Sequence, residues 1–154
     1  MPHPATVRPT AGQYASEFGK YISLVPDGDV RQLLAEQAGD LLRLLGRVCE
    51  SGSLVRHAPY TWSVKQVLGH ITDCERVFGH RAHWIARGGA APLVTFDEQA
   101  FMEVAAFDRW PFVELVDEFQ CVRRAHMLLF EHLEPGGWLR TGVVNDHPAT
   151  AAAA

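Results

Sequence analysis

Hydrophobic side chains recur at the helical period along three long stretches of the chain, and this pattern constrains the fold most. The stretches are residues 30–50, 63–87 and 111–134. We find no segment with the clear two-residue alternation that is typical of a half-buried strand. The pattern predicts an all-α chain with three amphipathic helices, and three such helices usually need a fourth to close a bundle.

Capping residues give the predicted ends of the first two helices. Asp29 is expected to cap the first helix, and Ser51-Gly52 to end it. Ser63 is followed three residues later by Gln66, which is the spacing of a capping box. The second helix is therefore expected to begin at Ser63.

The rest of the chain is predicted to hold shorter elements. Asp97 can cap a short helix, and Pro111 suits the first turn of the third long helix. Residues 1–13 are expected to form a flexible arm before one domain at residues 14–154. The final segment, WLRTGVVNDHPATAAAA, is expected to start as a loop and to begin a fourth helix at Thr150, because alanine favours helix.

Composition excludes several classes of protein. A chain of 154 residues has room for one core, and its formal charge of −4 does not favour nucleic acid or an anionic membrane as a partner. No apolar run approaches the ~18 residues of a membrane-spanning helix, and the first residues do not resemble a secretory signal. The three cysteines include no CxxC pair, which indicates reduced thiols in a cytoplasmic protein.

Helical geometry separates the eight histidines. His70 falls on the flank of the apolar face of the second helix, beside Cys74. His80 and His83 fall on the opposite side together with Lys65, where we expect a solvated basic stripe. Two ligands on an exposed face make a poor metal site, so this stripe is interpreted as structural.

His126 lies near the middle of the inward face of the third long helix. Such a histidine is more often a hydrogen-bonded core residue than a ligand, although bundle cores do host metal sites. His70 and His126 are two imidazoles that can face one bundle interior. A catalytic divalent metal wants three protein ligands and a water, and spacing alone offers no third.

The run YTWSVKQVLGHITDCERVFGHRAHWIARG resembles the signature of the DinB-like superfamily, also called DinB/YfiT, a family of metal-dependent enzymes. In that signature a Trp-Ser pair begins the second bundle helix, and a histidine ligand and then an acidic residue follow. The segments YISLVPDGDV, PLVTFDEQAF, EFQCVRRA and LEPGGWLRTGVVNDHPAT also resemble one subfamily, in order. The resemblance covers roughly residues 14–150.

This resemblance implies a four-helix bundle with a long crossover between helices 2 and 3, which would contain the short helix near residues 98–106. It implies a nickel or zinc ion held by three histidines, of which His70 would be the first. Asp73 would then stand behind the ligands and hold an imidazole or a water. The other two histidines would form an HxxxH pair on a fourth helix after HPAT, and the sequence ends at Ala154 before that pair.

Three explanations stay open for this missing or incomplete fourth helix. The sequence is incomplete at its C-terminus, the terminal alanines stand for unidentified residues, or the protein is truncated and borrows a helix. Three apolar stripes leave a groove that either missing residues or a neighbouring subunit must fill. The resemblance implies a homodimer in both cases, since many DinB-like proteins are dimers. The resemblance implies a metal-dependent S-transferase or hydrolase that acts on a small molecule, with a low-molecular-weight thiol as the co-substrate of a transferase. The alternative is a metal-free dimeric bundle that serves as an interaction or stress-response module.

Overall fold

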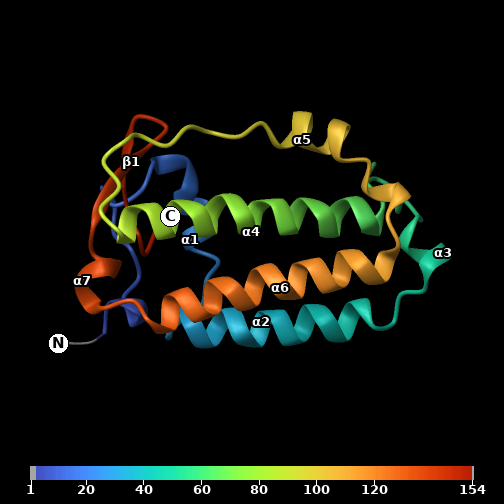
Figure 1. Ribbon diagram of the computed structural model, residues 1–154, viewed down its shortest axis with the longest axis horizontal. Helices are drawn as coiled ribbons and strands as arrows, with labels where there is room; N and C mark the ends of the chain where they lie inside the picture. The colour runs from blue at the N-terminus through green and yellow to red at the C-terminus, as the bar shows by residue number, and fades with distance from the viewer. Residues whose placement is uncertain (1–2, 154) are drawn as a thin grey trace. The chain divides into compact units, whose positions relative to one another are not determined.

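The computed structural model describes residues 3–153 of the chain, and these residues are mostly helical (Figure 1). The long helices are α2 (Val30–Leu45), α4 (Val64–Ala86) and α6 (Phe112–Glu131). The shorter elements, in chain order, are η1 (Pro4–Thr6), η2 (Ser16–Phe18), α1 (Gly19–Ile22), α3 (Glu50–Ser53), α5 (Glu98–Ala105), η3 (Phe107–Arg109), α7 (Pro135–Trp138), β1 (Thr141–Val144) and β2 (His147–Thr150). The three long helices expected from periodicity and the short helix expected after Asp97 are therefore present.

The chain divides into two compact units, which are described separately below. Unit 1 comprises Met1–Ala35, Val77–Thr95 and His126–Ala154. Unit 2 comprises Glu36–Arg76 and Phe96–Ala125. The divisions fall within α2, α4 and α6, so each long helix contributes residues to both units.

The predicted caps on α2 and α4 are confirmed. The Asp29 carboxylate accepts a hydrogen bond from the backbone N–H of Arg31 at 2.9 Å. At α4, the backbone N–H of Ser63 donates to Gln66 Oε1 at 3.0 Å, and the backbone N–H of Gln66 donates to Ser63 Oγ at 3.1 Å. These two reciprocal bonds form a complete capping box and fix the first residue of α4.

The expected end of the first helix, at Ser51-Gly52, is wrong. α2 ends at Leu45, and α3 begins separately at Glu50. Gly46 follows α2, and glycine is a poor helix former, so the chain leaves the helix through tighter turns here. The Glu50 side chain accepts hydrogen bonds from Lys65 Nζ and from the backbone N–H of Phe112, which ties α3 to α4 and α6.

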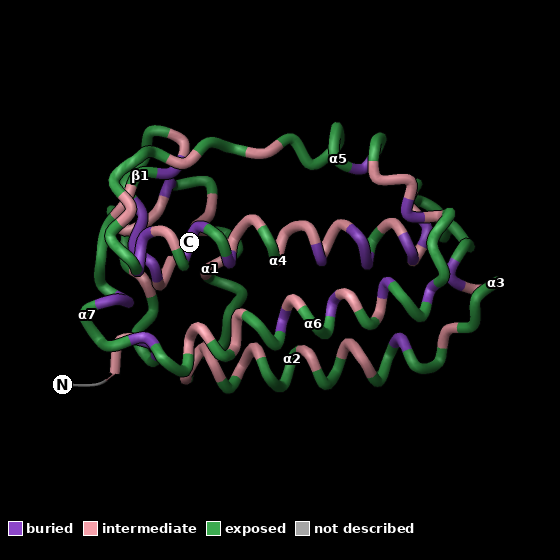
Figure 2. The backbone as a smooth tube through the Cα atoms, in the orientation of Figure 1, coloured by how far each residue is buried: buried purple, intermediate pink, exposed green. Residues whose placement is uncertain are grey.

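The core of unit 2 joins all three long helices with the crossover that contains α5. Its buried positions are drawn in purple in Figure 2 and are Leu45, Leu68, Met102, Phe107, Phe112, Leu115 and Phe119. Phe107 packs directly on Gly69, where an added Cβ would lie 2.5 Å from three atoms of its ring. α5, capped by Asp97 as predicted, and η3 thereby anchor the crossover on α4.

Lys65 and Arg123 are buried in unit 2, and the burial of Lys65 corrects a prediction. Lys65 was expected in a solvated stripe, but it is 2% exposed, and its ammonium group donates to Glu50 and to the Trp110 carbonyl at 2.6 Å. The ammonium group thus lies among acceptors that balance its charge. His80 and His83 on the same helix are exposed, as expected.

Unit 1 contains an antiparallel hairpin that the sequence pattern did not predict. β1 pairs with β2 in the register Thr141↔Thr150 to Val144↔His147. The two turn residues, Asn145 and Asp146, have φ values of 51° and 62°, the left-handed conformation that asparagine and aspartate tolerate. The expected all-α fold therefore needs correction by one short two-stranded sheet.

The hairpin packs into the core of unit 1. The buried members of that core are Ala5, Ile85, Ala86, Leu133, Trp138, Val144, Ala149 and Ala151. Thr150 ends β2, and the following alanines up to Ala153 form a turn, so the helix expected to begin there is wrong over the described residues. Ala154 lies outside them.

Part of the segment expected to be a flexible arm contacts this core. Ala5 is 4% exposed, and the backbone N–H of Ala5 donates to His3 Nδ1 at 3.1 Å. The His3 ring stands edge-on to Trp138, with ring centroids 6.4 Å apart. The division of the chain at residues 13 and 14 stays a prediction. Within residues 3–153, no helix is both long and apolar enough to cross a membrane.

Candidate functional site

His70 lies in the second turn of α4, in unit 2, with 22% of its side chain exposed. The Trp62 ring stands 5.1 Å from the imidazole, centroid to centroid, at an interplanar angle of 60°. Cys74 Sγ lies 3.6 Å from His70 Nε2, and a Glu98 carboxylate oxygen lies 3.9 Å from the same nitrogen. The imidazole therefore has an aromatic ring, a thiol and a carboxylate around it and still reaches solvent.

Local sequence explains this arrangement. The capping box starts α4 at Val64, which leaves Trp62 just ahead of the helix and puts His70 in its second turn. Cys74 follows His70 by four positions and so lies one turn along the same face. Glu98 arrives from α5, whose crossover packs on Gly69 through Phe107. The His70–Cys74 spacing was visible in the sequence, whereas the approach of Glu98 depends on the crossover.

Asp73 lies three residues after His70 and pairs with Arg76, at 3.3 Å between Oδ1 and Nη1. Arg76 in turn pairs with Glu118 at 2.6 Å. Burial raises the pKa of the Asp73 carboxyl, and the hydrogen bond from Arg76 opposes that rise. The contacts of Asp73 described here therefore point to Arg76, and its expected role behind a metal ligand stays a prediction.

His126 lies on α6 in unit 1, where it packs against α4. An added Cβ on Gly79 would come within 2.0 Å of His126 Nε2, so the ring occupies the space that the missing side chain leaves. The ring also lies 6.4 Å from that of Phe130, centroid to centroid. This packing is what the structural interpretation of His126 requires, and a role in metal binding stays a prediction.

The residues around His70 fit a metal by type but not by number. Nitrogen, thiolate sulfur and carboxylate oxygen are donors that zinc and related ions accept. Within the described part of the chain, however, no group of three or more His, Cys, Asp and Glu side chains is arranged to hold a metal ion. The described residues thus supply His70 as a candidate ligand but do not form a complete three-histidine site.

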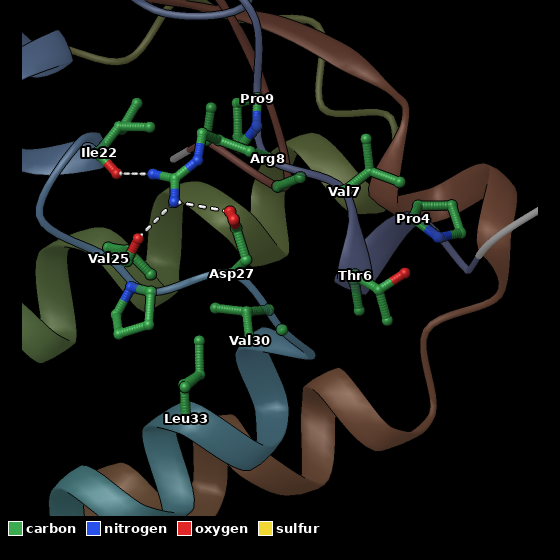
Figure 3. Close-up of a pocket in the computed structure, with 15 residues that line it drawn as sticks. Pro4, Thr6, Val7, Arg8, Pro9, Ile22, Val25, Asp27, Val30 and Leu33 are labelled. Carbon is green, nitrogen blue, oxygen red and sulfur yellow. Dashed lines mark hydrogen bonds and ion pairs between the residues drawn. The ribbon is translucent and has the colours of Figure 1, made fainter.

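A cavity of about 210 Å³ in unit 1 is a separate feature, and Figure 3 shows it. The Arg8 guanidinium group at its edge donates to the carbonyls of Ile22 and Val25 and to Asp27, the last at 2.9 Å. These acceptors tie the N-terminal segment to the turn before α2. Arg8 therefore holds the two segments together, and we do not interpret it as an anion-binding group.

Comparison with known proteins places the chain in a family. YfiT from Bacillus subtilis, described as a probable metal-dependent hydrolase with an unusual four-helix bundle topology, has a similar fold, with a TM-score of 0.69 and 18% sequence identity. The likeness covers 80% of this chain and 71% of YfiT. None of the curated proteins matches the sequence. A sequence model of the DinB superfamily matches residues 33–154, which is most of the chain, and the protein therefore belongs to the DinB superfamily.

Proposed function

We propose that this protein is a metal-dependent enzyme of the hydrolase or thiol-dependent S-transferase class, with His70 as one ligand of a divalent nickel or zinc ion. The observation that carries the proposal is the setting of His70, which is partly open to solvent beside a thiol and a carboxylate. Membership of the DinB superfamily supports it, as does the fold shared with YfiT, itself described as a probable metal-dependent hydrolase.

In this proposal the neighbours of His70 orient its imidazole. The Trp62 ring limits rotation of the imidazole on one side, and Cys74 lies one turn further along the helix. The described residues do not bring three metal-binding side chains into one site, so the proposal assigns only His70 and leaves the other ligands of the ion open. Because those ligands decide which coordination positions stay open, the choice between a thiol and a water as nucleophile depends on them.

Metal analysis of the purified full-length protein tests the proposal. After expression with added nickel or zinc, we expect about one equivalent of metal in the wild type and less than about a tenth in His70→Ala. Without His70, the two histidines of the implied HxxxH pair would be left as ligands, and two imidazoles alone bind a metal weakly. His80→Ala is the matched control, since His80 lies on the same helix and is exposed. Less than about a tenth of an equivalent in the wild type, or full occupancy in His70→Ala, would refute the proposal.

One observation favours a second function, that of a metal-free dimeric bundle that serves as an interaction module. Within the described residues, no group of three or more His, Cys, Asp and Glu side chains is arranged so that it could hold a metal ion. This candidate predicts a protein that is folded and dimeric without metal and whose stability does not change when nickel or zinc is added. The metal-dependent enzyme predicts instead that the metal raises stability, because it binds the folded state.

A further inference from the structure

A cavity of about 260 Å³ opens in unit 2 against α2 and α4. One turn of α2, including Leu44, forms one wall, and the first two turns of α4, including Val67, form another. The loop before α4 closes the cavity with Tyr60 and Trp62. The described residues that line it include His57 but no Asp, Glu, Lys or Arg, and most of them are apolar, so the lining favours an uncharged group.

Large apolar side chains are left open to solvent here. Leu44 is 60% exposed, Val67 is 42% exposed, and the Tyr60 ring is 74% exposed. Exposed apolar surface that lines a hollow is typical of a ligand site, because an apolar ligand removes that surface from water. The arrangement therefore favours an occupant that is itself apolar.

The dimensions of the cavity favour a small molecule over a docked helix. At ~1.5 Å per residue, the contributing wall of α2 is only about 6 Å long and that of α4 about 10 Å long, whereas a helix of three turns needs about 16 Å. A volume of about 260 Å³ equals that of roughly nine waters. A phenyl ring or a short alkyl chain fits such a space.

Trp62 lies beside both the cavity and His70. It lines the cavity, and its ring lies 5.1 Å from that of His70. We propose that this cavity receives the uncharged aromatic or short aliphatic group of a small-molecule substrate whose reactive end lies at His70. This inference rests on the proposed function, since it takes His70 as the reactive centre, but binding of the apolar group itself needs no metal.

The test is a ¹⁹F NMR titration of the metal-free, full-length protein with 4-fluorotoluene. We expect saturable binding, and binding of 4-fluorobenzoate that is weaker by about tenfold or more, because a carboxylate loses its water of hydration against a lining that is mostly apolar. Val67→Trp fills the cavity and should weaken 4-fluorotoluene binding by about tenfold or more. Val113→Trp is the matched control, since Val113 is an exposed helical valine of the same unit outside the cavity.

A second measurement locates the bound ring. We expect 4-fluorotoluene to shift the resonances of the Trp62 indole N–H and of the His70 imidazole, both in the wild type and in Val113→Trp. Absence of saturable binding in the wild type would overturn the inference, as would binding that leaves both resonances unchanged. A dimer that excludes 4-fluorotoluene and dissociates in Val67→Trp would also overturn it, because a second copy would then fill the cavity. Metal content plays no part in these measurements, so their failure is distinguishable from failure of the proposed function.

Discussion

The buried ion pair between Arg123 and Glu75 should behave as one unit when it is mutated. In unit 2, Arg123 Nε donates to Glu75 Oε2 at 2.9 Å, and Arg123 Nη2 donates to Glu75 Oε1 at 2.5 Å. Nη2 also donates to Gln37 Oε1 at 3.0 Å. The side chains of Arg123 and Glu75 are only 7% and 18% exposed, so water does little to screen either charge.

These values set the size of the expected effect. Arg123→Met removes the guanidinium group and leaves the Glu75 carboxylate buried without its main counter-charge, which typically costs about 3–5 kcal/mol. Glu75→Leu leaves the Arg123 charge in the same position and should cost a similar amount. The double variant replaces both charges with apolar groups of similar volume, so its stability should return to within about 1–2 kcal/mol of the wild type or exceed it.

Urea unfolding followed by circular dichroism measures this coupling as a double-mutant cycle. For a chain of this size, each single variant should also melt roughly 6–20 °C below the wild type. The exposed pair Arg43 and Asp40 on α2 provides the control, since Arg43→Met should change stability by less than about 0.5 kcal/mol. If the double variant loses as much as the two single variants added together, the reasoning from burial is wrong.

Three further predictions concern His126, Asp29 and the oligomeric state. His126→Leu should leave metal content unchanged and alter stability by no more than a few kcal/mol. Gly79→Ala should lower stability by about 1–3 kcal/mol because the new Cβ meets the His126 ring, and His126→Ala should rescue it. Urea unfolding midpoints measure both effects. Arg31 lowers the folded-state pKa of Asp29 chiefly through its side-chain hydrogen bond. The wild type should therefore be more stable than Asp29→Asn near neutral pH, and this difference should disappear as the pH falls through the lowered pKa. Sedimentation should show a homodimer, and a folded monomer at high micromolar concentration would contradict that proposal.

The helical part of the fold was predictable because its signals are local. Each long helix repeats its apolar positions over several turns, and caps at Asp29, Ser63 and Asp97 act within three residues of themselves. The burial of Lys65 was not predictable in this way. On a helical wheel it falls with the exposed His80 and His83, and its partners, Glu50 and the Trp110 carbonyl, come from 15 and 45 residues away. Helical phase shows which face a residue occupies but not what covers that face.

The same limit applies to His70 and to the hairpin. Phase placed His70 on the flank of α4 beside Cys74, and both were found there, but Glu98 reaches His70 only because the crossover packs on the helix. In the hairpin, each strand has four residues, which is too short for alternation to be recognised. The hairpin is held by close packing on α4, because an added Cβ at Gly142 would lie 2.7 Å from Ile85 Cγ1. A strand that close to a helix is selected by packing between segments nearly sixty residues apart, so periodicity along the chain could not reveal it.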